Sequence, residues 1–339
     1  IEVLRIGGTG TATSNMAGVS IATLDIDVSA GATGTQTLQS LTGVSTITID
    51  ADSNTAADND YPAVTITNGY TGTADSLTID VNSDGTNGMN GTEGLITASG
   101  VETLAITLDG GAAVQMGGFT SNTLSGITVS ANGDFDDTDS AVLGTITGGT
   151  GTIASFDSTG ADLALNVTVV SLGNNASVTL GDAGTGVTQT FSAGASPGVG
   201  ITIAGGSGVD DITGSAQADI ITAGAGNDVI ATGGGADVVD GGSGNDTITG
   251  TDTVVDTFTG GAGNDTLDGD GGLDVFTGGT GVDIFTFGDN VDTAAADMIT
   301  ITDAVGGLGG DIFKIDASAV AGGIVSALTL SVVNVAGAA

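Results

Sequence analysis

The chain has 339 residues, with 40 acidic and 2 basic side chains and a formal net charge of −38. This balance excludes a nucleic-acid binder, because no basic surface is available to neutralise phosphates. The absence of Cys and His excludes disulfides, Cys/His zinc sites and Ser-His or Cys-His nucleophile pairs, so we expect no enzymatic activity. Since 39% of the residues are hydrophobic, the chain can nevertheless bury a core.

The sequence has no run of about 18 apolar residues, so we expect no transmembrane helix. It begins at Ile1-Glu2-Val3-Leu4 with neither Met nor a charged-then-apolar leader, and we therefore expect a fragment of a longer protein. The absence of cysteine is typical of an extracellular protein that does without disulfides.

Residues 1–200 are dominated by short runs in which apolar and polar residues alternate. Such runs predict strands at Leu24–Val28, Thr46–Asp50, Leu77–Val81, Leu104–Leu108, Ile127–Val129, Val167–Val169 and Val178–Leu180. Helices are not expected, because 62 Gly residues interrupt every stretch long enough to propagate one. Because the runs are unevenly spaced, we predict an all-β, Thr/Gly/Ala-rich region that forms an irregular β-solenoid or stacked sheets.

From Gly205 the sequence changes to a nonapeptide repeat of nine units that ends at residue 286. The units begin at residues 205, 214, 223, 232, 241, 250, 260, 269 and 278, and only the unit 250–259 has ten residues. Each unit has Asp at its sixth or equivalent position and a large apolar residue two places later. The aspartates are Asp210, Asp219, Asp228, Asp237, Asp246, Asp256, Asp265, Asp274 and Asp283.

This spacing predicts a parallel β-roll. Six Gly-rich residues form a turn, and the remaining three form a minimal strand whose central side chain points inward. Two units complete one coil, so aspartates 18 residues apart stack about 4.8 Å from one another on the same edge. Stacked carboxylates repel unless a cation lies between them. Calcium fits this gap, because it takes about 6–8 oxygen ligands and turn carbonyls can supplement the aspartates.

The repeat resembles the calcium-binding RTX family, whose pattern GGxGxDxUx the units at 205, 241, 260 and 278 match position by position. The resemblance implies that calcium lies between successive turns and binds the sixth-position Asp of both. It also implies carbonyl ligands from positions two and four of one turn and from positions one and three of the next. The residues so implied are Asp210, Asp228, Asp246, Asp265 and Asp283, with Gly206, Gly208, Ala223, Gly224, Ala225, Gly226, Gly241, Gly242, Ser243, Gly244, Gly260, Gly261, Ala262, Gly263, Gly278 and Thr280.

The two edges of the predicted roll differ in sequence. The units at 205, 223, 241, 260 and 278 form a consensus edge that is close to the family pattern, and its four gaps are expected to hold about four calcium ions. The units at 214, 232, 250 and 269 form a second edge, where unit 214 lacks the glycine pair and unit 250 has an inserted residue. We expect weaker binding there, with Asp237 and Asp274 as ligands ahead of Asp219 and Asp256.

Three regions are therefore expected: a β-solenoid-like region at 1–200, a calcium-binding β-roll at 201–290 and a cap at 291–339. A cap is required because the last coil would otherwise expose apolar residues and an unpaired strand edge. The run Asp311-Ile312-Phe313-Lys314-Ile315-Asp316 resembles the segment that caps RTX rolls. Glu102 is expected to cap or solvate a strand.

Two other acidic clusters could wrap calcium or form solvated loops, and the sequence does not decide between these alternatives. They are Asp134, Asp136, Asp137 and Asp139, and Asp50, Asp52, Asp58 and Asp60.

The Thr/Ala/Gly-rich strands and the runs 1–6, 100–106 and 154–157 are similar to the C-terminal half of the calcium-dependent S-layer proteins of Gram-negative bacteria such as Caulobacter. This resemblance implies a structural protein, exported by a type I system, that folds on external calcium and forms a two-dimensional lattice at the cell surface. Lipopolysaccharide, bound through sequence that precedes Ile1, would anchor it. Two alternatives stay open: the repeat region of a large RTX adhesin and the secretion module of an RTX hydrolase.

Overall fold

The computed structural model of the chain describes residues 3–6, 11–27, 35–50, 63–67, 70, 75–82, 94–109, 114–132, 140–149, 153–160, 163–182, 188–194, 200–251, 254–287, 300–303 and 310–315. In these segments every regular element is a β-strand. The described residues contain no helix that is long and apolar enough to cross a membrane. The chain divides into two compact units, Ile1–Pro197 and Gly198–Ala339.

The first unit is wound from two parallel sheets. One sheet contains β1 (Val3–Ile6), β3 (Thr23–Asp27), β5 (Thr46–Asp50), β7 (Ser76–Asn82), β9 (Thr103–Asp109), β12 (Gly126–Asn132), β14 (Ile153–Gly160) and β16 (Leu172–Thr179), in this order. The other contains β2 (Ala12–Asn15), β4 (Thr35–Gln39), β6 (Ala63–Thr67), β8 (Ile96–Ala98), β11 (Gly118–Thr120), β13 (Ser140–Thr147), β15 (Ala164–Val170) and β17 (Thr188–Ala193), and β10 (Val114–Gln115) also pairs with β13. Since the chain visits the sheets alternately, this unit is a β-solenoid.

The strands expected in the first unit are present, and their apolar residues form the core. Each of the seven predicted runs overlaps a strand. In register, Leu77, Leu104 and Ile127 stack inside the coils and are each at most 1% exposed. Coil lengths vary, since Thr23 pairs with Thr46 but Thr46 pairs with Thr78. This variation explains why the sequence shows strands here without a fixed period.

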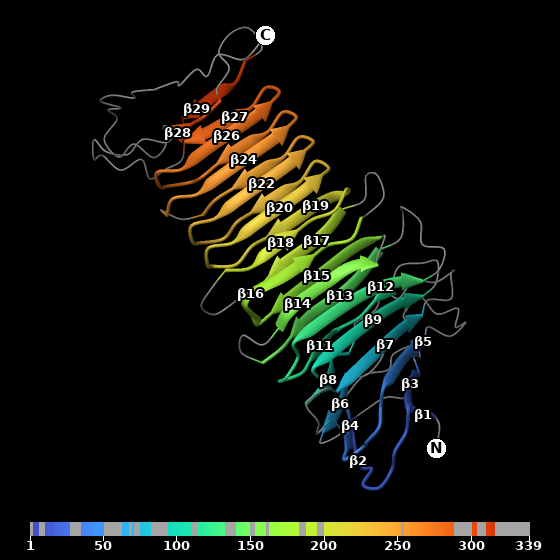
Figure 1. The fold of residues 1–339 in the computed structure, drawn as a ribbon. Coiled ribbons are helices and arrows are strands. Elements are labelled where there is room, and N and C mark those ends of the chain that lie inside the picture. Colours follow the sequence, from blue (N-terminus) through green and yellow to red (C-terminus); the bar gives the residue numbers. More distant parts are fainter. Residues whose placement is uncertain are drawn as a thin grey trace. The chain divides into compact units, whose positions relative to one another are not determined.

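The second unit contains the β-roll, whose strands form successive rungs in Figure 1. One sheet contains β18 (Thr202–Ala204), β20 (Ile220–Ala225), β22 (Val238–Ser243), β24 (Thr257–Ala262), β26 (Val275–Thr280) and β28 (Thr300–Ile301). The other contains β19 (Val209–Thr213), β21 (Val229–Ala231), β23 (Thr247–Thr249), β25 (Thr266–Asp268), β27 (Ile284–Phe287) and β29 (Ile312–Ile315). All described pairings are parallel, so the predicted fold class is confirmed.

The strands of the roll are not all as short as the repeat predicts. β21, β23 and β25 have three residues, but β20, β22, β24 and β26 have six. They are longer because the first three residues of each consensus-edge turn stay in the ladder, where Gly224 pairs with Gly242. These two glycines have φ angles of 115° and 103°, which side-chain-bearing residues rarely adopt. The glycine pair therefore lets a strand continue into the turn.

The eighth residue of every nonapeptide points into the roll and is at most 1% exposed. Toward the C-terminal end these residues are aromatic. The ring centroids of Phe258 and Phe276 lie 5.7 Å apart, those of Phe276 and Phe285 6.1 Å apart, and those of Phe285 and Phe313 5.6 Å apart. Phe313 lies in β29, so the segment after the repeats extends the aromatic core by one layer.

Candidate metal centre

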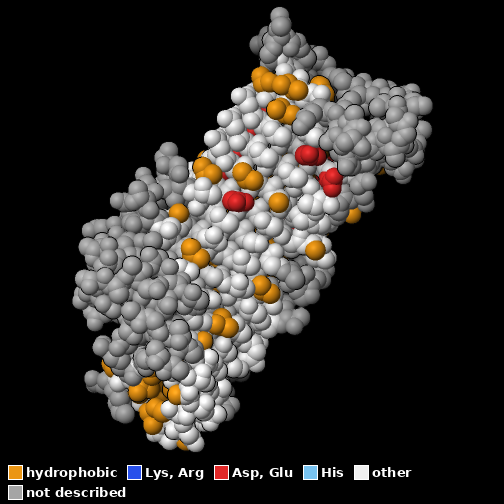
Figure 2. All heavy atoms as spheres, turned by 180° about the vertical axis from the view of Figure 1, so that it is seen from behind, with side chains coloured by type: hydrophobic (Ala, Val, Ile, Leu, Met, Phe, Trp, Pro, Cys, Tyr) orange, Lys and Arg blue, Asp and Glu red, His pale blue; other side chains and the backbone are white. Residues whose placement is uncertain are grey.

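Each sixth-position aspartate lies at the start of a strand and inside the protein. On the consensus edge, Asp210 is the second residue of β19, and the other four aspartates precede β21, β23, β25 and β27. The second-edge aspartates precede β20, β22, β24 and β26. All nine are at most 1% exposed, so they are not water-exposed turn residues. On the face shown in Figure 2, the described surface carries only scattered acidic side chains.

Successive aspartates are joined by a ladder of hydrogen bonds. On the consensus edge, the backbone N–H of Asp210 donates to Oδ1 of Asp228, and the N–H of Asp228 donates to Oδ1 of Asp246, at 2.8 and 2.9 Å. The same bond joins Asp246 to Asp265 and Asp265 to Asp283, at 2.9 and 3.0 Å. The aspartates therefore stack one coil apart, as the repeat length requires.

The second carboxylate oxygen of several aspartates has no partner. Oδ2 of Asp228, Asp246 and Asp265 on the consensus edge is buried and accepts no hydrogen bond, and the same holds for Oδ2 of Asp237 on the second edge. A buried carboxylate oxygen without a donor costs several kcal/mol unless a proton or a cation satisfies it. These oxygens fit a cation site.

Backbone carbonyls of the turns face the same gaps. An ideal Cβ placed on Gly241 would lie 2.6 Å from Oδ2 of Asp246 and 2.7 Å from the carbonyl oxygen of Gly260 in the next turn. Likewise, a Cβ on Gly226 would overlap the carbonyl oxygen of Gly208 and lie 2.9 Å from Oδ1 of Asp228. Carboxylate and carbonyl oxygens from two successive turns thus converge, as the RTX ligand set requires.

The structure brings the implied carbonyl ligands of the consensus edge together in two ways. The carbonyl oxygens of Gly206, Gly208, Gly224, Gly226, Gly242, Gly244, Gly261 and Gly263 lie against the glycine at the same position of the next turn. Those of Ser243, Ala262 and Thr280 at position three accept the position-four N–H of the preceding turn at 2.7–2.8 Å. A cation there would therefore use their second lone pair. Ala223, Gly260 and Gly278 at position one face position one of the preceding turn.

The second edge satisfies its first aspartate with protein groups alone. Oδ1 of Asp219 accepts the N–H of Ile201 at 2.8 Å and the hydroxyl of Ser215 at 2.8 Å, and its Oδ2 accepts the N–H of Ser215 at 2.6 Å. In unit 232, by contrast, Gly233 and Gly235 have φ angles of 90° and 114°, as consensus turns do. This contrast supports the expectation that Asp237 is a better calcium ligand than Asp219.

Burial raises the pKa of six of the stacked carboxyl groups, those of Asp219, Asp228, Asp237, Asp246, Asp265 and Asp283. Desolvation is the largest cause for each of these six, and it raises the pKa of Asp237 to about 7 and that of Asp246 to about 6. The pKa of Asp283 is raised to about 6 by burial and then by the charges of Asp265, Asp311 and Asp303. The roll without a cation therefore favours the protonated acids.

The calcium-free roll is expected to gain stability as the pH falls. The folded-state pKa values of about 6 to 7 lie above the ordinary value of 3.8. Their contribution is thus fully present below about pH 4 and is lost as the pH rises through about 6 to 7, by about 1–2 kcal/mol per carboxylate. The strand signal in circular dichroism, recorded in chelator at about pH 5 and about pH 8, measures this difference and is expected to be larger at about pH 5. An equal signal at the two pH values would contradict it.

Comparison with known protein families gives an independent result. Residues 204–285 match the model of the RTX calcium-binding nonapeptide repeat, in segments 204–239, 232–253 and 250–285. The chain therefore contains RTX calcium-binding repeats, and they cover the roll described above. No curated protein matches the chain.

The two acidic clusters of the first unit lie almost entirely outside the residues that the structure describes. Asp134, Asp136, Asp137, Asp139, Asp52, Asp58 and Asp60 lie outside the described residues, as does the side chain of Asp50. In the described segments, no group of three or more acidic side chains gathers at one point, so a cation site there needs backbone ligands. Oε2 of Glu102 accepts the N–H of Asp75 at 2.7 Å, which confirms that Glu102 caps a strand.

Sequence reasoning did not identify a second ladder on the consensus edge. Oδ1 of Asn227 accepts the N–H of Asn245, and Oδ1 of Asn245 accepts that of Asn264, both at 2.7 Å. Oδ1 of Asn264 accepts the N–H of Val282 at 2.8 Å. The signal was present, since Asn precedes Asp in units 223, 241 and 260. These amides hold successive turns in register beside the carboxylates.

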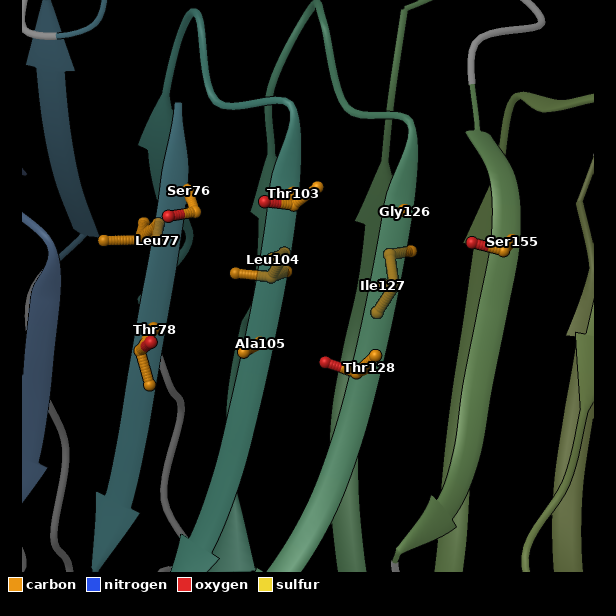
Figure 3. A pocket seen from close by; sticks show the side chains of 10 residues that line it. All are labelled: Ser76, Leu77, Thr78, Thr103, Leu104, Ala105, Gly126, Ile127, Thr128 and Ser155. Carbon is orange, nitrogen blue, oxygen red and sulfur yellow. The ribbon is translucent and has the colours of Figure 1, made fainter. Parts of the chain in front are cut away.

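A shallow hollow lies on the outer face of β7, β9, β12 and β14 (Figure 3). It forms where the small residues Ala105 and Gly126 lie between longer side chains. Around them stand the hydroxyls of Ser76, Thr78, Thr103, Thr128 and Ser155. The lining contains no titratable group, so the hollow offers no general acid or base.

Proposed function

We propose that this chain is part of a secreted structural protein that folds when its roll binds external calcium and that assembles into an S-layer lattice. The observation that carries the calcium-dependent step is the row of buried, unpartnered Oδ2 atoms on Asp228, Asp246 and Asp265. Those of Asp246 and Asp265 lie beside the same glycines that the carbonyl oxygens of Gly260 and Gly278 approach. The same nonapeptides match the RTX calcium-binding model. An all-β roll of this kind is typical of structural and adhesin regions.

The consensus-edge residues would hold about four calcium ions, one in each gap between its five turns. In each gap two aspartates supply carboxylate oxygens, and the turns supply carbonyl oxygens from positions two and four and from positions one and three. Calcium contributes positive charge that offsets the desolvated carboxylates. On the second edge, Asp237 and Asp274 are the proposed ligands.

Net charge and carboxylate burial together would make folding depend on calcium. With a formal charge of −38, the calcium-free chain repels itself, and burying nine carboxylates adds a desolvation cost. Calcium binds only to the folded roll and therefore stabilises the folded state by mass action. Such a chain stays unfolded and exportable in a calcium-poor cytoplasm, and it folds outside the cell.

Calcium removal is expected to unfold the roll. Far-ultraviolet circular dichroism of the chain at about pH 8 should show the strand signal of the roll with calcium and its loss with a chelator. Magnesium at the same concentration is the control, because its strict octahedral geometry does not suit this ligand set. A roll that is fully structured in chelator would contradict calcium-dependent folding.

The lattice is tested separately. Calcium-loaded protein should form two-dimensional sheets in electron micrographs, and protein that stays monomeric would favour the alternatives. These are the repeat region of an RTX adhesin and the secretion module of an RTX hydrolase, both of which have the same repeats. The full-length sequence distinguishes them, through tandem immunoglobulin-like domains or a catalytic domain upstream of Ile1. Anchoring to lipopolysaccharide is proposed only on the S-layer resemblance and would be tested on the same full-length protein.

A further inference from the structure

The sheet that contains β20, β22, β24 and β26 has an outer face with almost no charge. These four strands lie side by side in Figure 1, and the first and third residues of each point outward, since the second and fourth are buried. Within the four strands Asp240 is the one acidic residue, and there is no basic residue. This face is therefore an exception in a chain that carries 40 acidic side chains.

Large apolar side chains are exposed on this face and at its rim. Ile220 and Val238 pair in register and are 53% and 49% exposed. In the turns that precede β24 and β26, Val254, Val255 and Leu273 are 39–46% exposed. We call the outward residues of the four strands, together with these three turn residues, the neutral face. It contains five of the ten exposed large apolar residues in the described part of the chain.

The opposite sheet of the roll is more polar. Its strands β19 and β25 carry Asp211 and Asp268 on their outer side. Its exposed Val229, on β21, has Thr247 as its neighbour in register on β23. The turns before its strands contain the asparagine ladder, which includes Asn245. Adjacent exposed apolar residues are therefore not a general consequence of the nonapeptide repeat, but a property of one side of the roll.

The charge of the chain determines which partner fits the neutral face. A basic partner would be attracted to the many carboxylates elsewhere on the chain rather than to a face with one carboxylate. A second copy has the same formal charge of −38, so acidic surfaces of two copies repel each other. When two neutral faces meet, only Asp240 of each copy brings a charge to the contact. The face therefore fits a second copy of this chain.

The size of the neutral face indicates a weak, repeated contact. Four strands of six residues, at a spacing of about 4.8 Å and a rise of about 3.3 Å per residue, cover about 400 Å². A stable complex buries about 800 Å² on each partner, so an isolated pair of copies would associate weakly. In an array the same contact recurs and is reinforced by other contacts of the same subunits. The area thus suits an assembly better than a stable dimer.

We propose that the neutral face packs against the neutral face of a second copy of the chain, in a two-fold contact that buries Ile220 and Val238 of both copies. The two sheets would stack face to face, about 10 Å apart. The contact requires the folded roll, because its residues come together only when the four strands are paired. This inference rests on the proposed calcium-dependent assembly and names the surface through which copies associate.

Sedimentation velocity of the full chain in saturating calcium, over a range of protein concentrations, tests the contact. The double variant Ile220→Thr, Val238→Thr places at both sites the residue that the repeat has at Thr257, so the strands should be retained. It is expected to weaken self-association at least about tenfold, because both copies lose apolar contacts. Val229→Thr is the matched control, since Val229 is 50% exposed on the opposite sheet, and its self-association should equal that of wild type.

Asp240→Thr tests whether the partner is a second copy. Thr is the residue at the same position of the neighbouring strands, as Thr222 and Thr259 show. The variant removes one of two like charges that face each other, so self-association is expected to become stronger, by about threefold or more. A folding defect cannot produce such a gain. Unchanged or weaker self-association of Asp240→Thr would overturn the two-copy contact.

The same samples separate failure of this inference from failure of the proposed function. If wild type and the double variant form the same calcium-dependent assemblies, the neutral face is not the contact and the assembly stands. If Val229→Thr weakens association as much as the double variant does, the effect is not specific to the neutral face and the inference fails. If calcium-loaded wild type is monomeric at every concentration, the inference and the proposed assembly fail together.

Discussion

Replacing Gly244 by Ala is expected to abolish the folded roll even in saturating calcium. Gly244 has a φ angle of 129°, where a Cβ is strained, and that Cβ would overlap the carbonyl oxygen of Gly226 in the preceding turn. The overlapping atom is backbone and is one of the proposed calcium ligands, so it cannot move without loss of the gap. The free energy of unfolding should fall by more than about 4 kcal/mol.

The matched control is Gly126→Ala in the first unit. There a Cβ would approach no atom closer than the hydroxyl of Ser155, at 3.3 Å, and Gly126 lies within β12. Its stability should change by less than about 1 kcal/mol. Circular dichroism melts with calcium and with chelator compare the two variants. A Gly244→Ala protein that keeps the calcium-dependent transition of wild type would contradict the close approach of successive turns.

The roll could be predicted from the sequence because one spacing fixes three properties at once. A nine-residue period sets the turn, the inward eighth residue and the stacking of aspartates 18 residues apart, and the register of Ile221 with Val239 follows it. The inserted residue in unit 250 leaves this register intact, since Val239 pairs with Phe258. The inference from the repeat depended on this periodicity rather than on any single residue.

The first unit is less predictable because some of its strands carry little apolar pattern. β11 has a single large apolar residue, Phe119, between Gly118 and Thr120, so alternation cannot be seen. β17 buries Gln189, whose amide donates to the carbonyl of Gly181 at 2.6 Å, at a position where an apolar residue would be expected. Only the tertiary pairing of β11 with β8 and β13 defines such strands.

The partners of the aspartates also depend on structure rather than on sequence. Ser215 is an ordinary deviation from the repeat in sequence, but in the structure it donates both its N–H and its hydroxyl to Asp219. Asp303 and Asp311 lie outside the repeat, and only the pairing of β28 and β29 with the last coil puts them at its turn positions. Which carboxylates need a cation is therefore determined by hydrogen bonds that the repeat pattern does not contain.

Asp246→Asn is expected to have opposite effects with and without calcium. Its Oδ1 would still accept the N–H of Asp228, and an amide nitrogen in place of Oδ2 would lie beside the carbonyl oxygen of Gly260. Without calcium, removal of a buried charge whose pKa is raised to about 6 should stabilise the roll at about pH 8, by about 1–3 kcal/mol. With calcium, two adjacent gaps lose a ligand, and the calcium-induced gain should fall by about 3–5 kcal/mol.

Asp219→Asn is the contrasting variant, because both oxygens of Asp219 already accept hydrogen bonds from Ile201 and Ser215. An amide nitrogen there would face the N–H of Ser215 or its hydroxyl, so one bond is lost in either condition. The cost should be about 1–3 kcal/mol with calcium and without it, which leaves the calcium response unchanged. Circular dichroism measures both variants, through the strand signal in chelator and the calcium concentration at which half of the protein is folded. A roll in which Asp246→Asn is destabilised equally in the two conditions would mean that the unpaired Oδ2 is structural and not a ligand.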